Sequence, residues 1–352
     1  MKLGFGVHKP TTNLSVQLFE SAGGARIVQL PLEAFPDFWG YAYLVLIDDY
    51  RVLIDTGSGF GESNQHLEAG LASAGEQLGE PVSLGSLTHI LITHGHIDHF
   101  GGLSYVSEKS PALIGIHELD RLNLTHTEER LSLVARRLKV FLAEAGIESQ
   151  RRSELVQLYK LIKLNYQPVS VDFSYEAEQM RLGPFQMLHV PGHCAGHVVI
   201  RLHDVLFSGD HILSEISPHQ SPEQLALHTG LSHYLQSLQT LQVWAKDIRL
   251  TLAGHNTPIT KLNTRIEQIC QVHKQRLSHI SDIFSEPRTI AEVSQILFGE
   301  VYGYNVLLAL EETGAHVEYL SQRGKLSVVN IKALESSNGA VPIRYQTLNA
   351  ER

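Results

Sequence analysis

The sequence predicts a mixed α/β protein with one large domain followed by a smaller one. Short runs of β-branched and aromatic residues alternate with longer segments in which apolar residues recur every three or four positions, the patterns of buried strands and amphipathic helices. Of the 352 residues, 43% are hydrophobic and 18% charged, which suffices for a packed core and excludes a disordered chain. Histidine is the outlier, with 20 residues against two cysteines, and this surplus of a metal-ligating residue suggests a metal or proton-transfer role.

The first 100 residues predict a hairpin, a helix and a short buried strand. Val, Ile, Leu and Tyr dominate the strand candidates, and Asp48-Asp49-Tyr50 has the composition of a turn. The last apolar run leads directly into His94. The expected strands occupy 27–30, 41–47, 52–54 and 89–93, and the expected helix occupies 62–80.

Residues 118–168 predict a pair of amphipathic helices inserted into a strand-rich region. Apolar residues recur in steps of three or four from Leu131 to Ala145 and again from Leu155 to Ile162. The insert carries nine Lys or Arg against seven Asp or Glu, whereas the whole chain has a net charge of −9. Two interpretations stay open: a lid over the functional site that attracts a small anion, or solvated helix faces without a binding role.

Strands and two long helices are expected again after the insert. Gly183-Pro184 and His203-Asp204 mark turns between apolar runs. The expected strands occupy 169–173, 185–190, 197–202, 205–208 and 249–253, and the expected helices occupy 222–246 and 261–284.

Residues 286–352 predict a winged-helix domain, because three helices are followed by two β-like runs. Thr289 can cap the first helix. This segment contains six Lys or Arg against eight Glu, which disfavours nucleic-acid binding and favours a docking or homodimerisation role. The first expected helix ends at Phe298, and the other two occupy 304–312 and 313–322. The β-like runs occupy 326–332 and 341–346.

The strongest chemical signal is the segment Thr93-His94-Gly95-His96-Ile97-Asp98-His99. Three imidazoles and a carboxylate follow a buried strand, and these are good ligands for a borderline-soft divalent cation. Gly95 permits a tight turn between the first two histidines. The alternative, a His-rich surface loop, is disfavoured by the HxHxDH spacing directly after an apolar strand.

Three further segments place a histidine or aspartate beside a glycine just past an expected strand. They are Pro191-Gly192-His193-Cys194-Ala195-Gly196-His197, Ser208-Gly209-Asp210 and Ala253-Gly254-His255. Loops at strand ends are where α/β folds collect functional residues. Each segment alone is weak, because a single histidine after a glycine is usually a loop residue.

Taken together, the motif series resembles that of the metallo-β-lactamase-fold hydrolase superfamily over about residues 25–285. The resemblance implies a four-layer αββα sandwich, here over residues 1–285, with two metal ions at one edge. It further implies the role of each motif residue. His94, His96 and His193 would bind one metal; Asp98, His99 and His255 would bind the other; and Asp210 would bridge the two.

This ligand set suits hydrolysis. Five neutral imidazoles, two aspartates, two divalent metals and a bridging hydroxide leave a cationic site, in which the metals lower the pKa of water and stabilise a developing oxyanion. Asp98 and Asp210 are the expected catalytic residues. Zinc is the expected metal, with iron or manganese as alternatives.

Two residues near the ligands are expected to support them. Asp55 is expected to accept the free N–H of a ligand histidine and fix its tautomer, the alternative being a turn cap through Thr56-Gly57. His197 is either a buried hydrogen-bond donor to the site or an ordinary core histidine. Cys194 is expected to be a small buried residue rather than a ligand. The unassigned histidines, among them His8, His126 and His316, are expected at the surface.

The substrate expectation is a small ester, thioester or lactone, possibly an anionic one. Gly209-Asp210-His211-Ile212-Leu213 with Ile216-Ser217-Pro218 and a terminal winged helix resembles the lactamase-β-2-like, glyoxalase-II-like branch. Leu213 occupies the position at which lactonases resembling this fold carry tyrosine, and this weakens the prediction that the substrate is a lactone. A metal-dependent endoribonuclease or phosphodiesterase and a non-catalytic metal-binding protein are the alternatives.

The sequence also predicts a cytoplasmic protein. Glycine, histidine and proline interrupt residues 1–13, so no signal peptide is expected, and no apolar run has the ~18–20 residues of a membrane span. Two cysteines 76 positions apart form no disulfide framework, which favours a reducing compartment.

Overall fold

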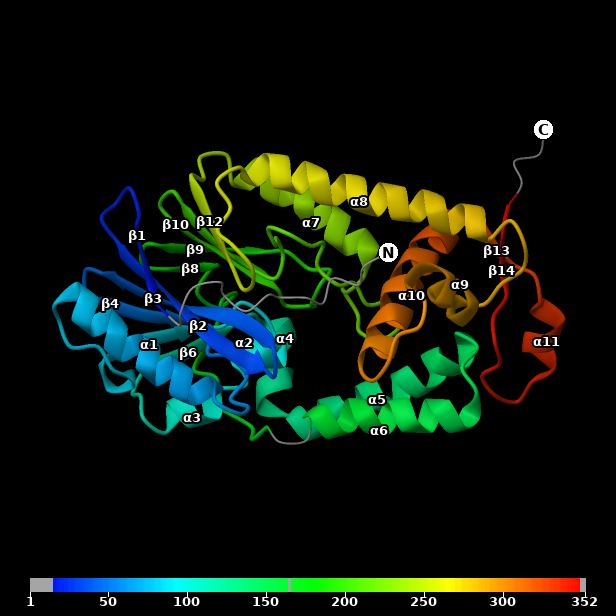
Figure 1. Ribbon diagram of the computed structural model, residues 1–352, viewed down its shortest axis with the longest axis horizontal. Helices are drawn as coiled ribbons and strands as arrows, with labels where there is room; N and C mark the ends of the chain where they lie inside the picture. The colour runs from blue at the N-terminus through cyan, green and yellow to red at the C-terminus, as the bar shows by residue number, and fades with distance from the viewer. Residues whose placement is uncertain (1–14, 164–165, 349–352) are drawn as a thin grey trace.

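The computed structural model describes residues 15–163 and 166–348, and within them seven strands form a mixed first sheet in the order β1 to β7 (Figure 1). Strands β1 to β4 pair antiparallel, and β4 to β7 pair parallel. The strands are β1 (Gln17–Glu20), β2 (Arg26–Phe35), β3 (Phe38–Ile47), β4 (Tyr50–Ile54), β5 (His89–Leu91), β6 (Leu113–Ile116) and β7 (Phe173–Ser174).

Five more strands of the described residues form a second sheet, in the order β12-β11-β10-β9-β8. Only β11 and β12 pair parallel, so both end at the same edge of the sheet. The strands are β8 (Arg181–Leu182), β9 (Phe185–His189), β10 (Val198–Leu202), β11 (Val205–Gly209) and β12 (Leu250–Ala253).

The two sheets and their helices form the predicted four-layer αββα sandwich. Because side chains alternate across a strand, Ile27 faces the second sheet while Val28 packs with helix α1 (Ser63–Leu78). In the second sheet, Ile200 faces the first sheet. Val199 packs on the other side, against helices α7 (Leu231–Trp244) and α8 (Leu262–Ile283). The layers therefore arise from the period-two pattern of the strands.

The insert contains the predicted pair of amphipathic helices, α5 (Thr127–Glu144) and α6 (Ser149–Lys163). A third helix, α4 (Glu118–Thr125), precedes them and was not predicted. Between α1 and β6 the chain also forms the 3-10 turn η1 (Leu84–Ser86) and the helices α2 (Ile97–Phe100) and α3 (Leu103–Ser107).

The C-terminal segment differs from the prediction in its helices. Helix α9 (Ile290–Phe298) begins at the predicted cap, since the Thr289 side chain accepts from the Glu292 N–H. The two helices expected at 304–312 and 313–322 are one continuous helix, α10 (Asn305–Gln322). Gly314 lies inside this helix, at a place where a larger residue would collide with the ring of Phe141, 2.8 Å from the ideal Cβ position.

The expected β-like runs are also shorter than predicted. The strands that form are β13 (Leu326–Val328) and β14 (Tyr345–Thr347), which pair with each other. The last two residues of the first predicted run belong to helix α11 (Ile331–Ser336). The winged-helix assignment of residues 286–352 stays a prediction.

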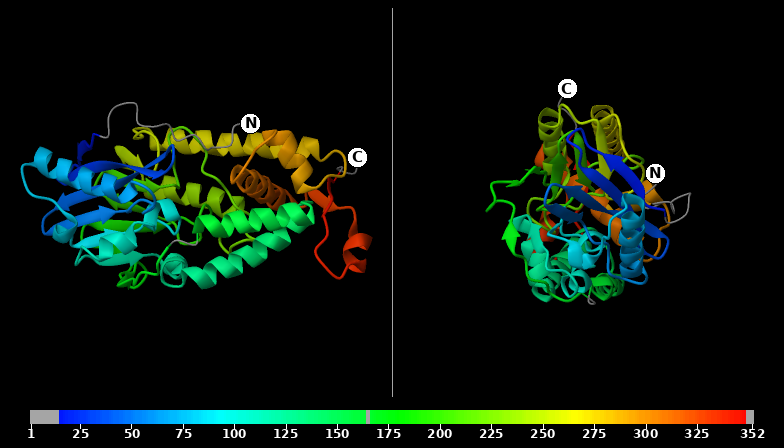
Figure 2. Two further views of the ribbon diagram at one scale, coloured as in Figure 1. Left: turned by 60° about the horizontal axis from the view of Figure 1, so that its bottom comes forward. Right: turned by 90° about the vertical axis from the view of Figure 1, so that its left-hand side faces the viewer.

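A separate hydrophobic cluster joins the insert to the C-terminal segment. It includes Leu138 and Phe141 of α5, Phe284 just after α8, and Leu307 and Val317 of α10. Figures 1 and 2 show the sheets at one end of the molecule and this helical body at the other. In the described residues, none of the helices combines the length and apolar composition that crossing a membrane requires.

Helix α7 begins nine residues later than expected, because the preceding segment is held by α10 instead. The backbone N–H of Gln220 donates to Glu312, and the Ser221 hydroxyl donates to Glu311. Glu318 accepts from the backbone N–H of Glu223. These carboxylates of α10 satisfy two backbone N–H groups and one hydroxyl of the segment before α7.

Candidate metal centre

Two groups of side chains converge where the loops after β5, β9, β11 and β12 meet. Within each group, one ligand atom from every residue lies within 4.8 Å of the others. We call them the first set, which comprises His94, His96 and His193, and the second set, which comprises Asp98, His99, Asp210 and His255. All seven predicted ligands are therefore brought together, with Asp210, the predicted bridge, grouped with Asp98, His99 and His255.

The first set combines loops from both sheets. His94 and His96 follow β5, and His94 Nε2 lies 3.1 Å from His96 Nδ1. His193 follows β9, and its Nδ1 donates to the His219 carbonyl at 2.8 Å. The anchored Nδ1 leaves His193 Nε2 as the nitrogen able to ligate a metal.

The second set is also buried and is anchored in the same manner. His255 Nδ1 donates to the Trp39 carbonyl at 2.7 Å, and its Nε2 lies 3.3 Å from Asp98 Oδ2. His99 Nδ1 donates to Asp55 Oδ2 at 2.8 Å. Gly254 is required here, because a Cβ atom would stand 2.6 Å from Asp210 Oδ1.

Asp210 lies between the two sets. Its Oδ1 is 3.4 Å from His99 Nε2, while its Oδ2 is 3.4 Å from His255 Nε2 and 3.7 Å from His193 Nε2. A carboxylate that approaches histidines of both sets has the placement expected of a bridging ligand.

Asp55 has the supporting position that the sequence predicted. Besides His99, its carboxylate accepts from the backbone N–H and the hydroxyl of Thr93, both at 2.8 Å. Its backbone has a φ of 60°, a left-handed conformation that is uncommon outside glycine and often marks a functional site. His197 also touches the site, but as an acceptor rather than a donor: the Asp210 N–H donates to its Nε2 at 3.1 Å.

The residues fit two bound cations on the chemistry of their unsatisfied atoms. Within the described residues, His99 Nε2, His193 Nε2, His255 Nε2 and Asp210 Oδ1 are buried without a hydrogen-bond partner. Buried polar atoms without partners are costly, and here they converge on one place. Metal ions at the two sets would satisfy them.

The two sets differ in their affinity for protons. Burial lowers the pKa values of His94 and His193, so these imidazoles are neutral near pH 7. Burial also opposes protonation of His99 and His255, but the neighbouring carboxylates outweigh it. They raise the pKa of His99 well above its ordinary value and that of His255 to about 10. Conversely, burial disfavours the Asp98 carboxylate, yet His99 and His255 lower its pKa to about 2.

Zinc binding to the metal-free protein should therefore release protons, and chiefly from the second set. At pH 7 His99 and His255 carry protons that a metal must displace, so we expect about two protons released per chain. Zinc affinity of the second set should fall as the pH drops below about 10, where His255 protonates. Calorimetric titration in buffers of different ionisation enthalpy measures the release. Loading without proton release would contradict the charge states assigned here.

Comparison with known proteins identifies the family. A model of the metallo-beta-lactamase superfamily matches residues 37–255, more than half of the chain. This chain belongs to that superfamily. The match ends at His255, the last of the predicted ligands.

Relatives within the superfamily extend the similarity over most of the chain. The probable metallo-hydrolase YqjP of Bacillus subtilis is 25% identical over 77% of this chain and 85% of its own length. The beta-lactamase-like protein 2 homolog of Drosophila melanogaster is 25% identical over 81% of this chain and 83% of its own. An atrochrysone carboxyl ACP thioesterase of Aspergillus aculeatus is 24% identical over 74% of this chain and 65% of its own.

Solved structures show that the fold is shared. The metallo-beta-lactamase family protein TTHA1429 of Thermus thermophilus has a TM-score of 0.70 at 24% identity, covering 92% of this chain and 98% of that one. A beta-lactamase domain protein of Burkholderia ambifaria also has a TM-score of 0.70, at 22% identity, covering 98% of each chain. The predicted family, fold class and enzyme class agree with these comparisons.

The remaining histidines correct one expectation. His126 is exposed as predicted, and His8 lies outside the described residues. His316 was expected at the surface but is fully buried, because α10 packs between the insert and α8. It forms a third group with His273 and Glu312.

This third group is held together by protein contacts. His273 Nδ1 lies 3.1 Å from His316 Nε2, and His316 Nδ1 donates to the Glu312 carbonyl at 2.7 Å. The Glu312 carboxylate pairs with buried Arg276 and accepts from the Gln220 N–H. A guanidinium already neutralises this carboxylate, so the group is an ion-paired network between α8 and α10.

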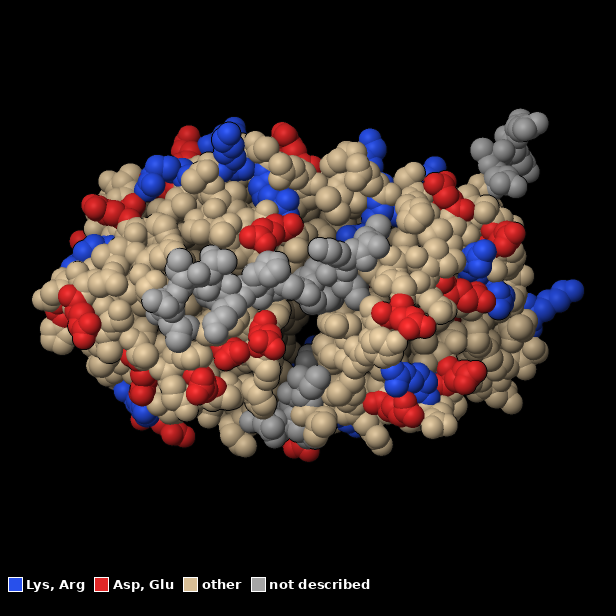
Figure 3. All heavy atoms as spheres, viewed as in Figure 1, with Lys and Arg blue, Asp and Glu red and all other residues tan. Residues whose placement is uncertain are grey.

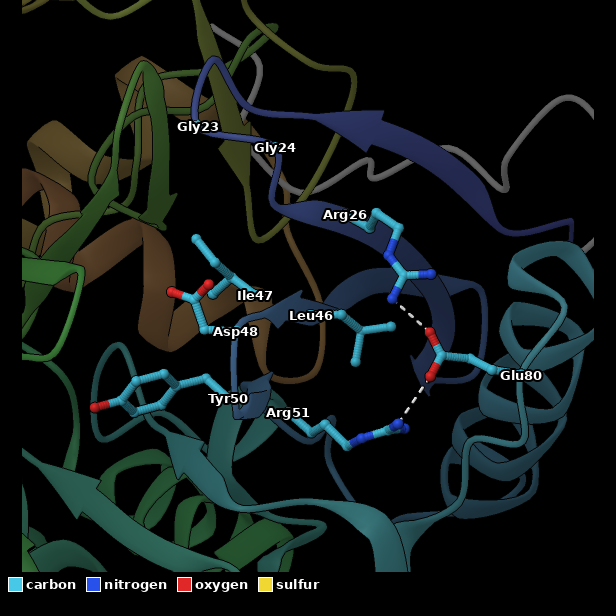
Figure 4. A pocket seen from close by; sticks show the side chains of 9 residues that line it. All are labelled: Gly23, Gly24, Arg26, Leu46, Ile47, Asp48, Tyr50, Arg51 and Glu80. Atoms are coloured by element: carbon cyan, nitrogen blue, oxygen red, sulfur yellow. Dashed lines mark hydrogen bonds and ion pairs between the residues drawn. The ribbon is translucent and has the colours of Figure 1, made fainter.

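A surface pocket of about 250 Å³ lies apart from the predicted residues (Figure 4). It is lined by strands β2 to β4 and by Glu80, whose carboxylate binds both Arg26 and Arg51. The two guanidinium groups are balanced by Glu80 and by Asp48, which also lines the pocket, so the pocket offers no net charge to an anionic ligand.

Proposed function

We propose that this member of the metallo-beta-lactamase superfamily hydrolyses a small thioester, ester or lactone with two divalent metal ions, zinc being the expected metal. The observation that carries the proposal is the position of Asp210, whose two oxygens approach histidines of both sets. The first and second sets would each hold one ion. Such a pair lowers the pKa of water and polarises the carbonyl that is attacked.

The chain's own residues prepare this chemistry. Asp55 fixes the orientation of His99, and the carbonyls of His219 and Trp39 fix those of His193 and His255. Each ring therefore presents its Nε2 to the same buried space before any ligand arrives. A preorganised site needs no rearrangement when charge develops in the transition state.

The substrate class is supported by charge and by one relative. A curated relative is named as a carboxyl ACP thioesterase, which makes a thioester the first class to test. On the face shown in Figure 3, Lys and Arg are interspersed with Asp and Glu, whereas a nucleic-acid surface needs clustered basic residues. The insert is mildly basic, and its helix α4 lies next to the site. These two features favour a small anionic substrate and a role for the insert as a lid.

Three further features of the proposal follow from the sequence. The C-terminal segment would serve docking or homodimerisation, nucleic acid would not be a partner, and the protein would work in the cytoplasm. Each rests on composition rather than on a contact seen in the structure.

The test combines metal analysis with a substrate panel on the same sample. We expect about two metal ions per chain, and hydrolysis of acyl thioesters or aryl esters that a chelator abolishes and zinc restores. Cleavage of single-stranded RNA in place of ester hydrolysis would support the nuclease alternative. Two bound metals with neither activity would support a binding protein.

A further inference from the structure

Asp120 is a buried carboxylate in the first turn of α4 that no part of the proposed chemistry uses. It is 1% exposed, although it belongs to the largely solvent-facing insert. Its Oδ2 accepts from the Gly95 N–H at 2.7 Å, and its Oδ1 accepts from the Gly196 N–H at 3.0 Å. The Cys194 thiol donates to the same carboxylate, with Sγ 3.1 Å from Oδ2.

These donors belong to the two loops that carry the first set. Gly95 lies between His94 and His96, and Cys194 directly follows His193. One loop follows a strand of the first sheet and the other a strand of the second sheet. A single carboxylate therefore joins the two sheets at the place where three ligand imidazoles must meet.

The glycines of both loops make this approach possible. A Cβ atom at Gly196 would stand 2.7 Å from Asp120 Cγ. At Gly95 it would stand 3.1 Å from Asp120 Cγ and 2.4 Å from Asn123 Nδ2. Both motif glycines are thus required by the close approach of the α4 side chains.

The hydrogen bonds from three groups favour the ionised form of Asp120, whereas its burial opposes that form. Burial raises the pKa of Asp120, and the hydrogen bonds from Cys194, Gly95 and Gly196 oppose that rise. Burial, followed by the Asp120 charge, raises the pKa of the Cys194 thiol well above its ordinary value, so the thiol keeps its proton and donates. The first turn of a helix also favours a negative charge.

We propose that Asp120 is a positioning residue that holds the loops of His94, His96 and His193 in register for metal binding. The proposal rests on the proposed function, in that the first set must bind a metal. It assigns a role to the start of the insert: the insert reaches the site through one carboxylate, which links it to the ligand loops.

The test measures zinc affinity rather than activity. The full chain is stripped of metal and titrated with Zn²⁺ in competition with a chromophoric chelator. The variants His193→Ala and His255→Ala identify which dissociation constant belongs to which set. For Asp120→Asn, which keeps the shape but loses the charge and one acceptor, we expect first-set affinity to fall about 10- to 100-fold with the second set little changed.

Three variants make the result specific. Asp55→Asn should show the opposite selectivity, weakening the second set through His99. Asp204→Asn alters a carboxylate that accepts from the Ala22 N–H and pairs with Arg249, on a turn away from the ligands, and should change neither constant. Cys194→Ala removes one donor of the three and should weaken the first set by roughly 2- to 10-fold, which keeps the test valid if Asp120→Asn misfolds.

The outcomes separate the two proposals. A wild-type chain that binds two Zn²⁺ ions while Asp120→Asn and Cys194→Ala keep wild-type constants would overturn the positioning role alone. Equal losses at both sets, together with a lower melting temperature of the metal-free variant, would show a merely structural role and also overturn it. A wild-type chain without Zn²⁺ affinity would overturn the proposed function as well.

Discussion

Replacing Asp210 by alanine is expected to lower hydrolysis by about 10²–10³-fold and to reduce bound metal below two ions per chain. The reason is that Asp210 belongs to the second set yet also approaches the first, since its Oδ2 lies 3.4 Å from His255 Nε2 and 3.7 Å from His193 Nε2. Without the carboxylate, two cations would face each other with less negative charge between them. Steady-state kinetics on the best substrate of the panel and elemental analysis of the same sample measure both effects.

Two controls accompany this variant. Asp210→Asn keeps the shape and one carbonyl oxygen, so it should retain more metal than Asp210→Ala and remain slow. Asp204→Asn, on a turn away from the ligands, should keep wild-type turnover and metal content. Full turnover and two metals in Asp210→Ala would refute the bridging role and the dinuclear mechanism with it.

Replacing Arg276 by methionine is expected to destabilise the protein by about 3–5 kcal/mol, because it leaves the buried Glu312 carboxylate without its counter-charge. Burial disfavours that carboxylate, but Arg276 and the nearby histidines hold its pKa at about 2. A lowered pKa stabilises the fold above the unfolded value near pH 4.5, and this contribution is lost as the pH falls towards 2. Urea unfolding of the two proteins at pH 7 measures the difference.

Two comparisons show whether burial is the cause. Arg151→Met breaks an exposed ion pair with Glu154 and should cost about 0–1 kcal/mol. The double variant Arg276→Met, Glu312→Met removes both charges and should recover much of the lost stability. A cost below about 1 kcal/mol for Arg276→Met alone would mean that the Glu312 environment can absorb an unpaired charge.

Much of the sandwich could be predicted from local pattern. In the second sheet, strands β9 to β12 each begin and end within one residue of the predicted bounds. In the first sheet, β2 contains the predicted run 27–30 but continues to Phe35. Helix α8 begins and ends within one residue of its predicted bounds. These elements depend on periodicity, which neighbouring residues carry by themselves.

The errors lie where a distant contact replaced a local preference. Residues 304–312 and 313–322 were predicted as two helices, yet they form the single helix α10, in which Gly314 lies where Phe141 of the insert leaves no room for a side chain. The first residues expected in α7 are held instead by Glu318, which accepts from the N–H groups of Glu223 and Gln224. Neither contact is visible in a window of the sequence.

For the site, the sequence by itself determined which residues are candidate ligands, because each is a histidine or aspartate placed beside a glycine or at close spacing just after a buried strand. Only the tertiary structure decided how they are oriented. The His219 and Trp39 carbonyls that orient His193 and His255, the burial of His316, and the contact of Asp120 with two loops all join segments far apart in the chain. Hydrogen bonds and packing act over a few ångströms in space, and only the folded chain brings such partners within that range.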